Sequence, residues 1–229
     1  MKLRGATIPQ EIVERVVARR GRAHCFADLE AKQTALVVID LQNAFMDEAV
    51  GHAVCPAAID IVPTVNRLAR ALRAAGGGVF WVRMTHDARC LEDWSVAHAI
   101  ATPEMRDKRI AALTAGSKGH ALWPDLDVLP EDEIVDKYRY SGFLPGTSEL
   151  RDRLRTRGFD TLLVTGTVTN VCCESSARDA SMLNFRTIMV SDGNAAASQA
   201  EHDAALAAFY NVFGDVMDSA MILDLLGAG

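Results

Sequence analysis

Long apolar runs without polar alternation recur along this chain. The clearest is Ala-Leu-Val-Val-Ile at residues 35–39. Further runs lie at 78–84, 133–136, 161–165, 186–191 and, more weakly, 215–218. A strand that is covered on both faces needs no polar positions, so these runs are typical of a parallel sheet between two layers of helices.

Helical stretches alternate with the apolar runs. They lie near residues 57–75, 147–157, 171–184 and 198–212. Strands that alternate with helices of this length predict a doubly wound sheet. We therefore predict the α/β class, with three layers (α/β/α) and a six-stranded, mainly parallel sheet in a Rossmann-like order. Ligands of such folds bind at the carboxyl ends of the strands.

The N-terminal segment precedes this pattern and predicts an amphipathic helix over 7–21. Thr7 and Gln10 resemble a capping box, and Gly21 stands at the exit. The apolar stripe of this helix comprises Ile12, Val13, Val16 and Val17. We expect the stripe to be buried on the domain or on a second subunit, because an amphipathic face needs a partner.

The chain length of 229 residues suits one domain, since single cores stop growing only near ~250–300 residues. We predict an N-terminal helical extension at 1–32 and one domain at 33–229. Two connections, 43–55 and about 85–132, are too long for plain turns and are candidate pocket walls. The second is expected to contain a short helix over 103–115.

Composition narrows the class of protein. Hydrophobic residues make up 49% of the chain and charged residues 24%, which is typical of a folded globular protein. The net charge of −6 disfavours binding to nucleic acid. No apolar run approaches the ~20 residues that span a bilayer, and residues 1–22 lack the apolar core of a signal peptide. We expect a cytoplasmic protein without a membrane or nucleic-acid partner, whose five cysteines are free thiols.

Two charged residues follow predicted strands. Asp40 ends the first strand, and Lys137 ends the run at 133–136. Both should lie at the carboxyl edge of the sheet. Each has an ordinary alternative, because a strand-end aspartate is most often a turn residue and a strand-end lysine is usually solvated.

A third candidate lies where the strand at 161–165 runs into a helix. The turn reads Gly-Thr-Val-Thr-Asn-Val-Cys-Cys-Glu-Ser from Gly166. A thiol in the first helical turn is favoured as thiolate by unpaired N–H groups and by the helix dipole. The alternative is that both cysteines are small core residues. Cys173 shares a stripe with Ala177 and Ala180, whereas Cys172 points elsewhere and is the better nucleophile.

Three segments, taken in order, resemble the isochorismatase-like cysteine hydrolases. This family includes N-carbamoylsarcosine amidohydrolase, nicotinamidase, ureidoacrylate amidohydrolase and biuret hydrolase. The segments are Asp40-Leu41-Gln42-Asn43, Lys137-Tyr138-Arg139-Tyr140-Ser141-Gly142-Phe143, and Gly166-Thr167-Val168-Thr169-Asn170-Val171-Cys172. The residues of these segments are most similar to those of ureidoacrylate amidohydrolases.

The resemblance implies a catalytic triad of Asp40, Lys137 and Cys172. It also implies a cis peptide bond between Thr167 and Val168, with the N–H groups of Val168 and Cys172 forming an oxyanion hole. The reaction implied is hydrolysis of the C–N bond of a small carbamoyl or ureido amide through a thioester, by a homo-oligomer. Two alternatives are vinyl ether hydrolysis of the isochorismatase type and a non-catalytic scaffold.

Substrate contacts are expected from Gln42, Asn43, Phe45 and Tyr140. If the substrate carries a carboxylate, Arg83 or Arg139 could bind it. We expect no metal and no other cofactor. The strand that ends in Arg83 and Met84 lacks the Asp-x-His element of nicotinamidases, and the six histidines show no ligand spacing. The glycines at 76–78 precede a strand, which disfavours a dinucleotide site.

Overall fold

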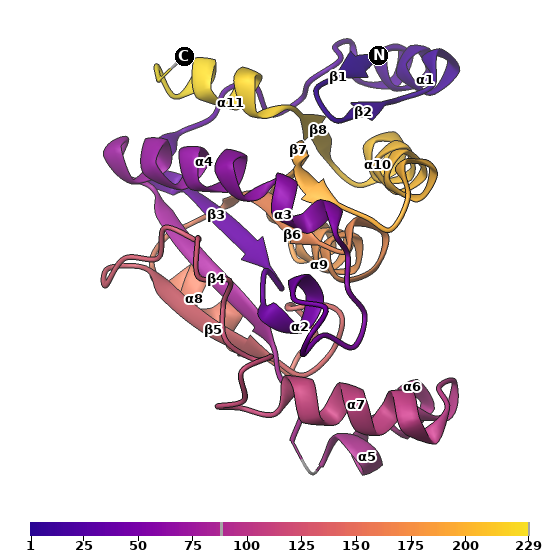
Figure 1. The fold of residues 1–229 in the computed structure, drawn as a ribbon. Coiled ribbons are helices and arrows are strands. Elements are labelled where there is room, and N and C mark those ends of the chain that lie inside the picture. Colours follow the sequence, from indigo (N-terminus) through magenta and orange to yellow (C-terminus); the bar gives the residue numbers. More distant parts are fainter. Residues whose placement is uncertain (88, 229) are drawn as a thin grey trace.

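A six-stranded parallel sheet organises the computed structural model, which describes residues 1–87 and 89–228 (Figure 1). The strands are β3 (Thr34–Ile39), β4 (Gly78–Met84), β5 (Glu133–Lys137), β6 (Thr161–Thr167), β7 (Arg186–Ala195) and β8 (Asp215–Met217). Their order is β5-β4-β3-β6-β7-β8, and every pairing is parallel. This is the Rossmann order, so the predicted fold class is confirmed.

The chain reverses its direction of winding between β3 and β6. From β3 it proceeds to β4 and β5 on one side, and from β6 to β7 and β8 on the other. Ligands in open α/β sheets bind at the carboxyl ends of the strands beside such a switch point. Asp40 follows β3 and Val168 follows β6 at this place.

Helices cover both faces of the sheet, because successive strand residues point to opposite faces. Leu36 and Val38 pack in one core with α3 (Ala57–Asp60), α4 (Val62–Ala74) and α11 (Ser219–Leu225). Val37 and Ile39 pack in the other core with α8 (Leu150–Thr156), α9 (Glu174–Met182) and α10 (Gln199–Val212). The continuous apolar runs therefore mark strands that are buried on both sides.

The N-terminal segment differs from the predicted helix at its start. A small hairpin comes first, with β1 (Lys2–Leu3) antiparallel to β2 (Ala6–Thr7), and α1 spans Gln10–Arg20. The predicted capping box is wrong, because Thr7 belongs to β2 and no side chain caps α1. Gly21 ends the helix in the left-handed conformation, with φ of 74°, as its place at the exit predicted.

The apolar stripe of α1 is only partly buried on its own domain, since Ile12 and Val13 are half-buried and Val17 is exposed. The helix packs against α10, where Val16 is fully buried (Figure 1). The Arg20 guanidinium donates hydrogen bonds to the carbonyls of Tyr210 and Gly214, each at 2.9 Å. Part of the stripe is therefore buried on the domain, and Val17 stays exposed in the single chain. Oligomerisation and the boundary between 1–32 and the domain stay predictions, and Gly229 lies outside the described residues.

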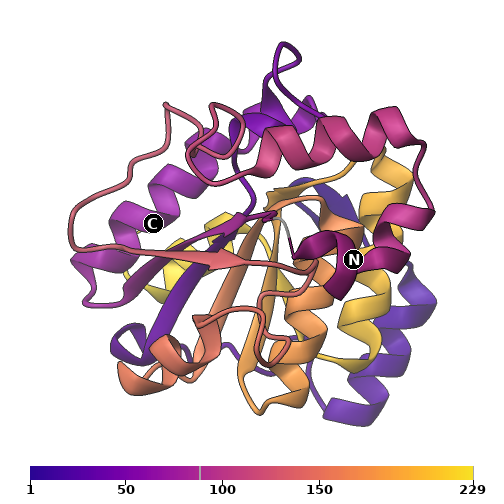
Figure 2. The ribbon, with the colours of Figure 1, turned by 90° about the horizontal axis from the view of Figure 1, so that it is seen from below.

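The two long connections form a layer beyond the carboxyl ends of the strands. The first contains α2 (Asn43–Met46), and the second contains α5 (Cys90–Asp93), α6 (Ser95–Ala99) and α7 (Pro103–Leu113). Viewed from below, α5 to α7 lie in front of the sheet (Figure 2). The helix predicted over 103–115 is thus confirmed, although it ends at Leu113. None of the helices in the described part of the chain could cross a membrane.

Candidate active site

Asp40 turns out of β3 in the left-handed conformation, with φ of 56°. Its side chain is fully buried, and its N–H donates to the Val82 carbonyl at 2.9 Å. The neighbouring strand β6 needs a glycine at position 166, because Gly166 has a φ of +122° and a Cβ there would lie 2.0 Å from the Ile39 carbonyl oxygen. The close approach of β3 and β6 therefore holds the Asp40 carboxylate at the switch point of the sheet.

Lys137 ends β5 and reaches Asp40 across β4. Its Nζ donates to Asp40 Oδ2 at 2.9 Å and to the Arg139 carbonyl at 3.2 Å, and both side chains of the pair are fully buried. A lysine at a strand end is ordinarily solvated, so a completely buried one requires a partner. The Asp40 carboxylate supplies that partner.

Cys172 lies in the helical turn η2 (Thr169–Cys173), which leads into α9. Its side chain borders the cavity described below, whereas Cys173 is completely buried against the sheet. The thiol of Cys173 lies 4.0 Å from the Thr165 carbonyl oxygen. The expected difference between the two cysteines is thus present in the structure, and all five cysteines are free thiols.

The three side chains influence one another's protonation. Burial raises the pKa of the Cys172 thiol, the Asp40 charge raises it further, and Lys137 opposes both. Burial also raises the pKa of Asp40, against the effects of Lys137 and the Cys172 thiol. For Lys137, burial lowers the pKa, but the negative charges of Asp40 and Cys172 outweigh it and the pKa is raised. At rest the site therefore holds a neutral thiol beside an Asp40–Lys137 ion pair.

A backbone donor lies beside the sulfur. The peptide bond between Thr167 and Val168 is cis, as the family resemblance implies. The Val168 carbonyl accepts the N–H groups of Val171 and Cys173, at 3.0 and 3.3 Å. Val168 and Cys172 both line the cavity described below.

A cavity of about 200 Å³ adjoins Cys172. Its walls come from the two long connections, the β4 end and the η2 turn. The lining residues are Phe45, His52, Ala53, Met84, His86, Trp94, Arg109, Leu113, Tyr140, Val168, Val171 and Cys172. Phe45 and Tyr140 were expected here. His52, His86, Trp94 and Arg109 were not, and the only sequence signal for them was the length of the connections.

Two predicted substrate contacts, Gln42 and Asn43, do not line the cavity. Gln42 Nε2 donates to the carbonyls of Met84 and His120, at 3.1 and 2.9 Å, and its Oε1 accepts the Met84 N–H at 2.7 Å. Asn43 Nδ2 donates to the Lys118 carbonyl at 2.8 Å. The amides of Gln42 and Asn43 thus bind backbone groups of β4 and of the long connection, and their role as substrate contacts stays a prediction.

Neither candidate arginine lines this cavity. Arg83 Nε pairs with Asp136 Oδ1 at 2.8 Å. Arg139 donates to the carbonyls of Tyr138 and Asp93, at 2.7 and 2.9 Å. A strand or turn position does not reveal which partners the fold brings within reach, and here a carboxylate pairs with Arg83 and two backbone carbonyls accept from Arg139.

Replacement of Gln42 by leucine tests its structural role. The variant leaves the buried N–H and carbonyl of Met84 and the His120 carbonyl without their side-chain partner. Each unsatisfied buried group costs ~1–3 kcal/mol, so we expect the free energy of unfolding to fall by several kcal/mol. Urea unfolding measures this loss. If the stability is unchanged and KM is raised, Gln42 contacts the substrate instead.

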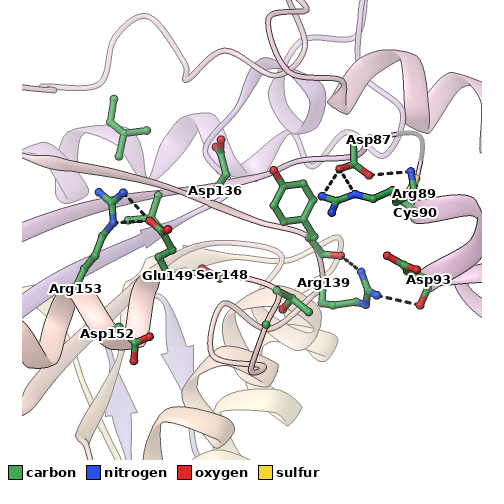
Figure 3. Close-up of a pocket in the computed structure, with 15 residues that line it drawn as sticks. Asp87, Arg89, Cys90, Asp93, Asp136, Arg139, Ser148, Glu149, Asp152 and Arg153 are labelled. Atoms are coloured by element: carbon green, nitrogen blue, oxygen red, sulfur yellow. Dashed lines mark hydrogen bonds and ion pairs between the residues drawn. The ribbon is translucent and has the colours of Figure 1, made fainter.

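A larger cleft of about 590 Å³ lies outside this cavity, along β5 and α8 (Figure 3). Its charged side chains are largely paired: Arg89 with Asp87, Arg153 with Glu149, and Arg139 with the Asp93 carbonyl. None of Asp40, Lys137 and Cys172 lines it. The smaller cavity is therefore the candidate active site.

Three histidines around the cavity differ from the other three in their hydrogen bonding. His24, His120 and His202 have side-chain partners, in Asp215, Thr85 and Thr169. By contrast, both ring nitrogens of His86 and of His98 and Nδ1 of His52 are buried without a partner in the described part of the chain. His86, Cys90 and His98 place potential ligand atoms within 4.8 Å of one another, so the fold creates a possible metal-ligand group that no sequence spacing revealed.

Acid is expected to destabilise the protein through these histidines. Burial lowers the pKa of His52 from 6.5 to about 4, so the unfolded chain binds a proton that the folded chain excludes. The free energy of unfolding should therefore fall as the pH drops from 6.5 to 4, by up to about 3 kcal/mol from His52. Urea unfolding across this range measures the slope. The slope should be shallower in His52→Phe than in wild type. An equal slope in the two proteins would contradict the contribution assigned to His52.

Comparison with known proteins comes from sequence and from structure. The isochorismatase domain model matches residues 34–221. A ureidoacrylate amidohydrolase from Methylobacterium radiotolerans is 35% identical over 214 residues, covering 87% of this chain and 81% of that protein. Another, from Stutzerimonas stutzeri, is 34% identical over 199 residues, covering 80% and 77%.

Solved structures agree with the sequence matches. A cysteine hydrolase from Pseudomonas syringae superimposes with a TM-score of 0.74 at 29% identity, covering 88% of this chain and 95% of that one. An N-carbamoylsarcosine amidase from Thermoplasma acidophilum gives 0.65 at 26% identity, covering 82% and 96%. The domain match covers most of the chain, and the sheet order and the strand-end site agree with it. The chain therefore belongs to the isochorismatase family of hydrolases.

Proposed function

We propose that the protein is a cysteine-dependent amidohydrolase of small carbamoyl or ureido compounds. The observation that carries the proposal is a thiol at the wall of a cavity, with a buried aspartate and a buried lysine acting on it. The names of the relatives, ureidoacrylate amidohydrolase and N-carbamoylsarcosine amidase, support the same class of substrate. The cavity of about 200 Å³ suits a compact substrate, since drug-sized ligands occupy ~300–1,000 Å³.

The first half of the reaction forms a thioester. Asp40 accepts the proton of Cys172 as the sulfur attacks the carbonyl carbon, and a tetrahedral oxyanion forms. The N–H groups of Val168 and Cys172 bind that oxyanion. Collapse of the intermediate breaks the C–N bond, and the proton on Asp40 passes to the leaving nitrogen. An amine or ammonia departs, and the acyl or carbamoyl group stays on sulfur.

The second half releases the product. Asp40 takes a proton from a water molecule, and the hydroxide attacks the thioester carbonyl. The C–S bond breaks, and the thiolate recovers its proton from Asp40. The product is an acid or a carbamate, and a carbamate decomposes to carbon dioxide and an amine or ammonia. Lys137 stays charged throughout and stabilises whichever of Asp40 and Cys172 is anionic.

Ammonia release from a panel of amides tests this function. The panel contains ureidoacrylate, biuret, N-carbamoyl amino acids and nicotinamide. Isochorismate is added as the vinyl ether, and its hydrolysis is followed by pyruvate release. We expect turnover of at least one ureido or carbamoyl compound and none of isochorismate. Cleavage of isochorismate alone would favour the vinyl ether reaction. Inertness towards the whole panel would favour a non-catalytic scaffold.

A further inference from the structure

The cavity wall contributed by α7 and by the segments after β3 and β4 is rich in nitrogen donors. Arg109 of α7, His52 and His86 all line the cavity beside Cys172. No aspartate or glutamate of the described chain lines it. The remaining lining is mostly apolar or aromatic, including Phe45, Trp94 and Leu113. A fixed positive charge in such surroundings is weakly screened, so it attracts an anion strongly.

The Arg109 guanidinium has unused hydrogen-bonding capacity. Its Nη1 donates to the Ala97 carbonyl at 3.1 Å, which anchors α7 on α6. No carboxylate lies within ion-pairing distance of it in the part of the chain that the structure describes. An arginine carries five N–H donors in a planar fork that matches a carboxylate. Its charge also helps to lower the pKa of His52, His86 and His98, which places it close to all three.

The two histidines of the wall supply further donors. Both ring nitrogens of His86 and Nδ1 of His52 are buried without a partner in the described structure. Burial lowers the pKa of His86 to about 3 and that of His52 to about 4, so both rings are neutral near pH 7. A neutral imidazole still donates one N–H. A buried polar group without a partner costs ~1–3 kcal/mol, and a bound ligand would recover that cost.

We propose that Arg109, together with ring N–H groups of His52 and His86, binds a carboxylate of the substrate. The enzyme then selects ureido or carbamoyl acids over neutral amides of the same size. This inference rests on the proposed function, and it names the charged group that the substrate carries. The anion holds the far end of the molecule while its carbamoyl carbon lies at the Cys172 sulfur.

His86 could instead bind a metal ion with Cys90 and His98, because their potential ligand atoms all lie within 4.8 Å of one another. The surrounding charge favours the anion. Arg109 places a permanent positive charge beside His86 and His98, which repels a divalent cation. No carboxylate belongs to the group to offset that repulsion.

Selectivity between paired substrates tests the proposal. The pair is ureidoacrylate and its primary carboxamide, which differ in one negative charge. In Arg109→Gln we expect the ratio of kcat/KM for the acid to kcat/KM for the amide to fall about 10- to 100-fold, mainly through KM for the acid. Arg106→Gln is the matched control, because Arg106 lies on the same helix, pairs with Asp107 and does not line the cavity. An unchanged ratio in Arg109→Gln would overturn the proposal.

Binding to inactive protein separates this inference from the proposed function. Calorimetric titration of Cys172→Ala with ureidoacrylate should show one site, weakened about 10- to 100-fold by the added Arg109→Gln change. Equal binding by both proteins would overturn the anion site. Binding that depends on Arg109, without hydrolysis of any amide by wild type, would refute the proposed function and keep the site. Stoichiometric binding of Zn²⁺ that is abolished in His98→Ala would favour a metal site and would overturn the proposed carboxylate site. Melting temperatures confirm that each variant is folded.

Discussion

Replacement of Cys172 by alanine is expected to lower kcat for amide hydrolysis by at least ~10⁴-fold, because the variant has no atom that can form the thioester. The Asp40–Lys137 pair should survive, since neither side chain depends on the sulfur for its ion pair. Ammonia release measures the loss. Intact-mass spectrometry of wild type mixed briefly with substrate should also show an acyl adduct that the variant lacks.

Cys173→Ala is the matched control for this experiment. Cys173 is the chain neighbour of Cys172 and is equally small, but it is buried against the sheet and does not line the cavity. It should keep activity within a few-fold and lose some stability through the small void that it leaves. Retention of full activity by Cys172→Ala, or loss of activity only in Cys173→Ala, would refute the assignment of the nucleophile.

Substitution of one partner of the buried Asp40–Lys137 ion pair should have the second largest effect, a loss of folding free energy. Asp40→Asn leaves Lys137 as an uncompensated buried charge, and Lys137→Met does the same to Asp40. Breaking a buried pair costs ~3–5 kcal/mol of folding free energy, so each single variant should lose about that much. The double variant should lose less than the sum, because it buries neither charge. Denaturant unfolding of the four proteins gives the coupling energy.

An exposed pair supplies the comparison. Lys118 and Asp47 pair at 3.1 Å, and the lysine side chain is 68% exposed. Surface pairs contribute ~0–1 kcal/mol, so Lys118→Met should change stability by less than about 1 kcal/mol. A similarly small change in Lys137→Met would mean that water reaches Asp40 or that the carboxyl is protonated in the folded protein. Either result would contradict the resting state inferred for the site.

The pattern of apolar and polar residues was sufficient to predict the sheet and the reactive groups at its carboxyl edge. Continuous β-branched runs can be read as buried parallel strands without tertiary information, because a strand covered on both faces has no polar positions. Strand ends of a parallel sheet converge at one edge, which predicted the meeting of Asp40, Lys137 and Cys172. The rotation of about 100° between helical neighbours separated Cys172 from Cys173.

The surroundings of the reactive groups were decided by the tertiary structure. Gln42, Asn43 and Arg83 carry groups suited to a substrate, but the folded chain gives each a partner of its own. Arg109 and His86 lie in the long connection, where no helical or strand period indicates which residues face inward. Periodicity reports the local geometry of a strand or helix, so it located the reactive groups on the sheet. The conformation of an irregular connection depends on contacts between distant residues, so only the tertiary structure revealed the cavity wall and the arginine within it.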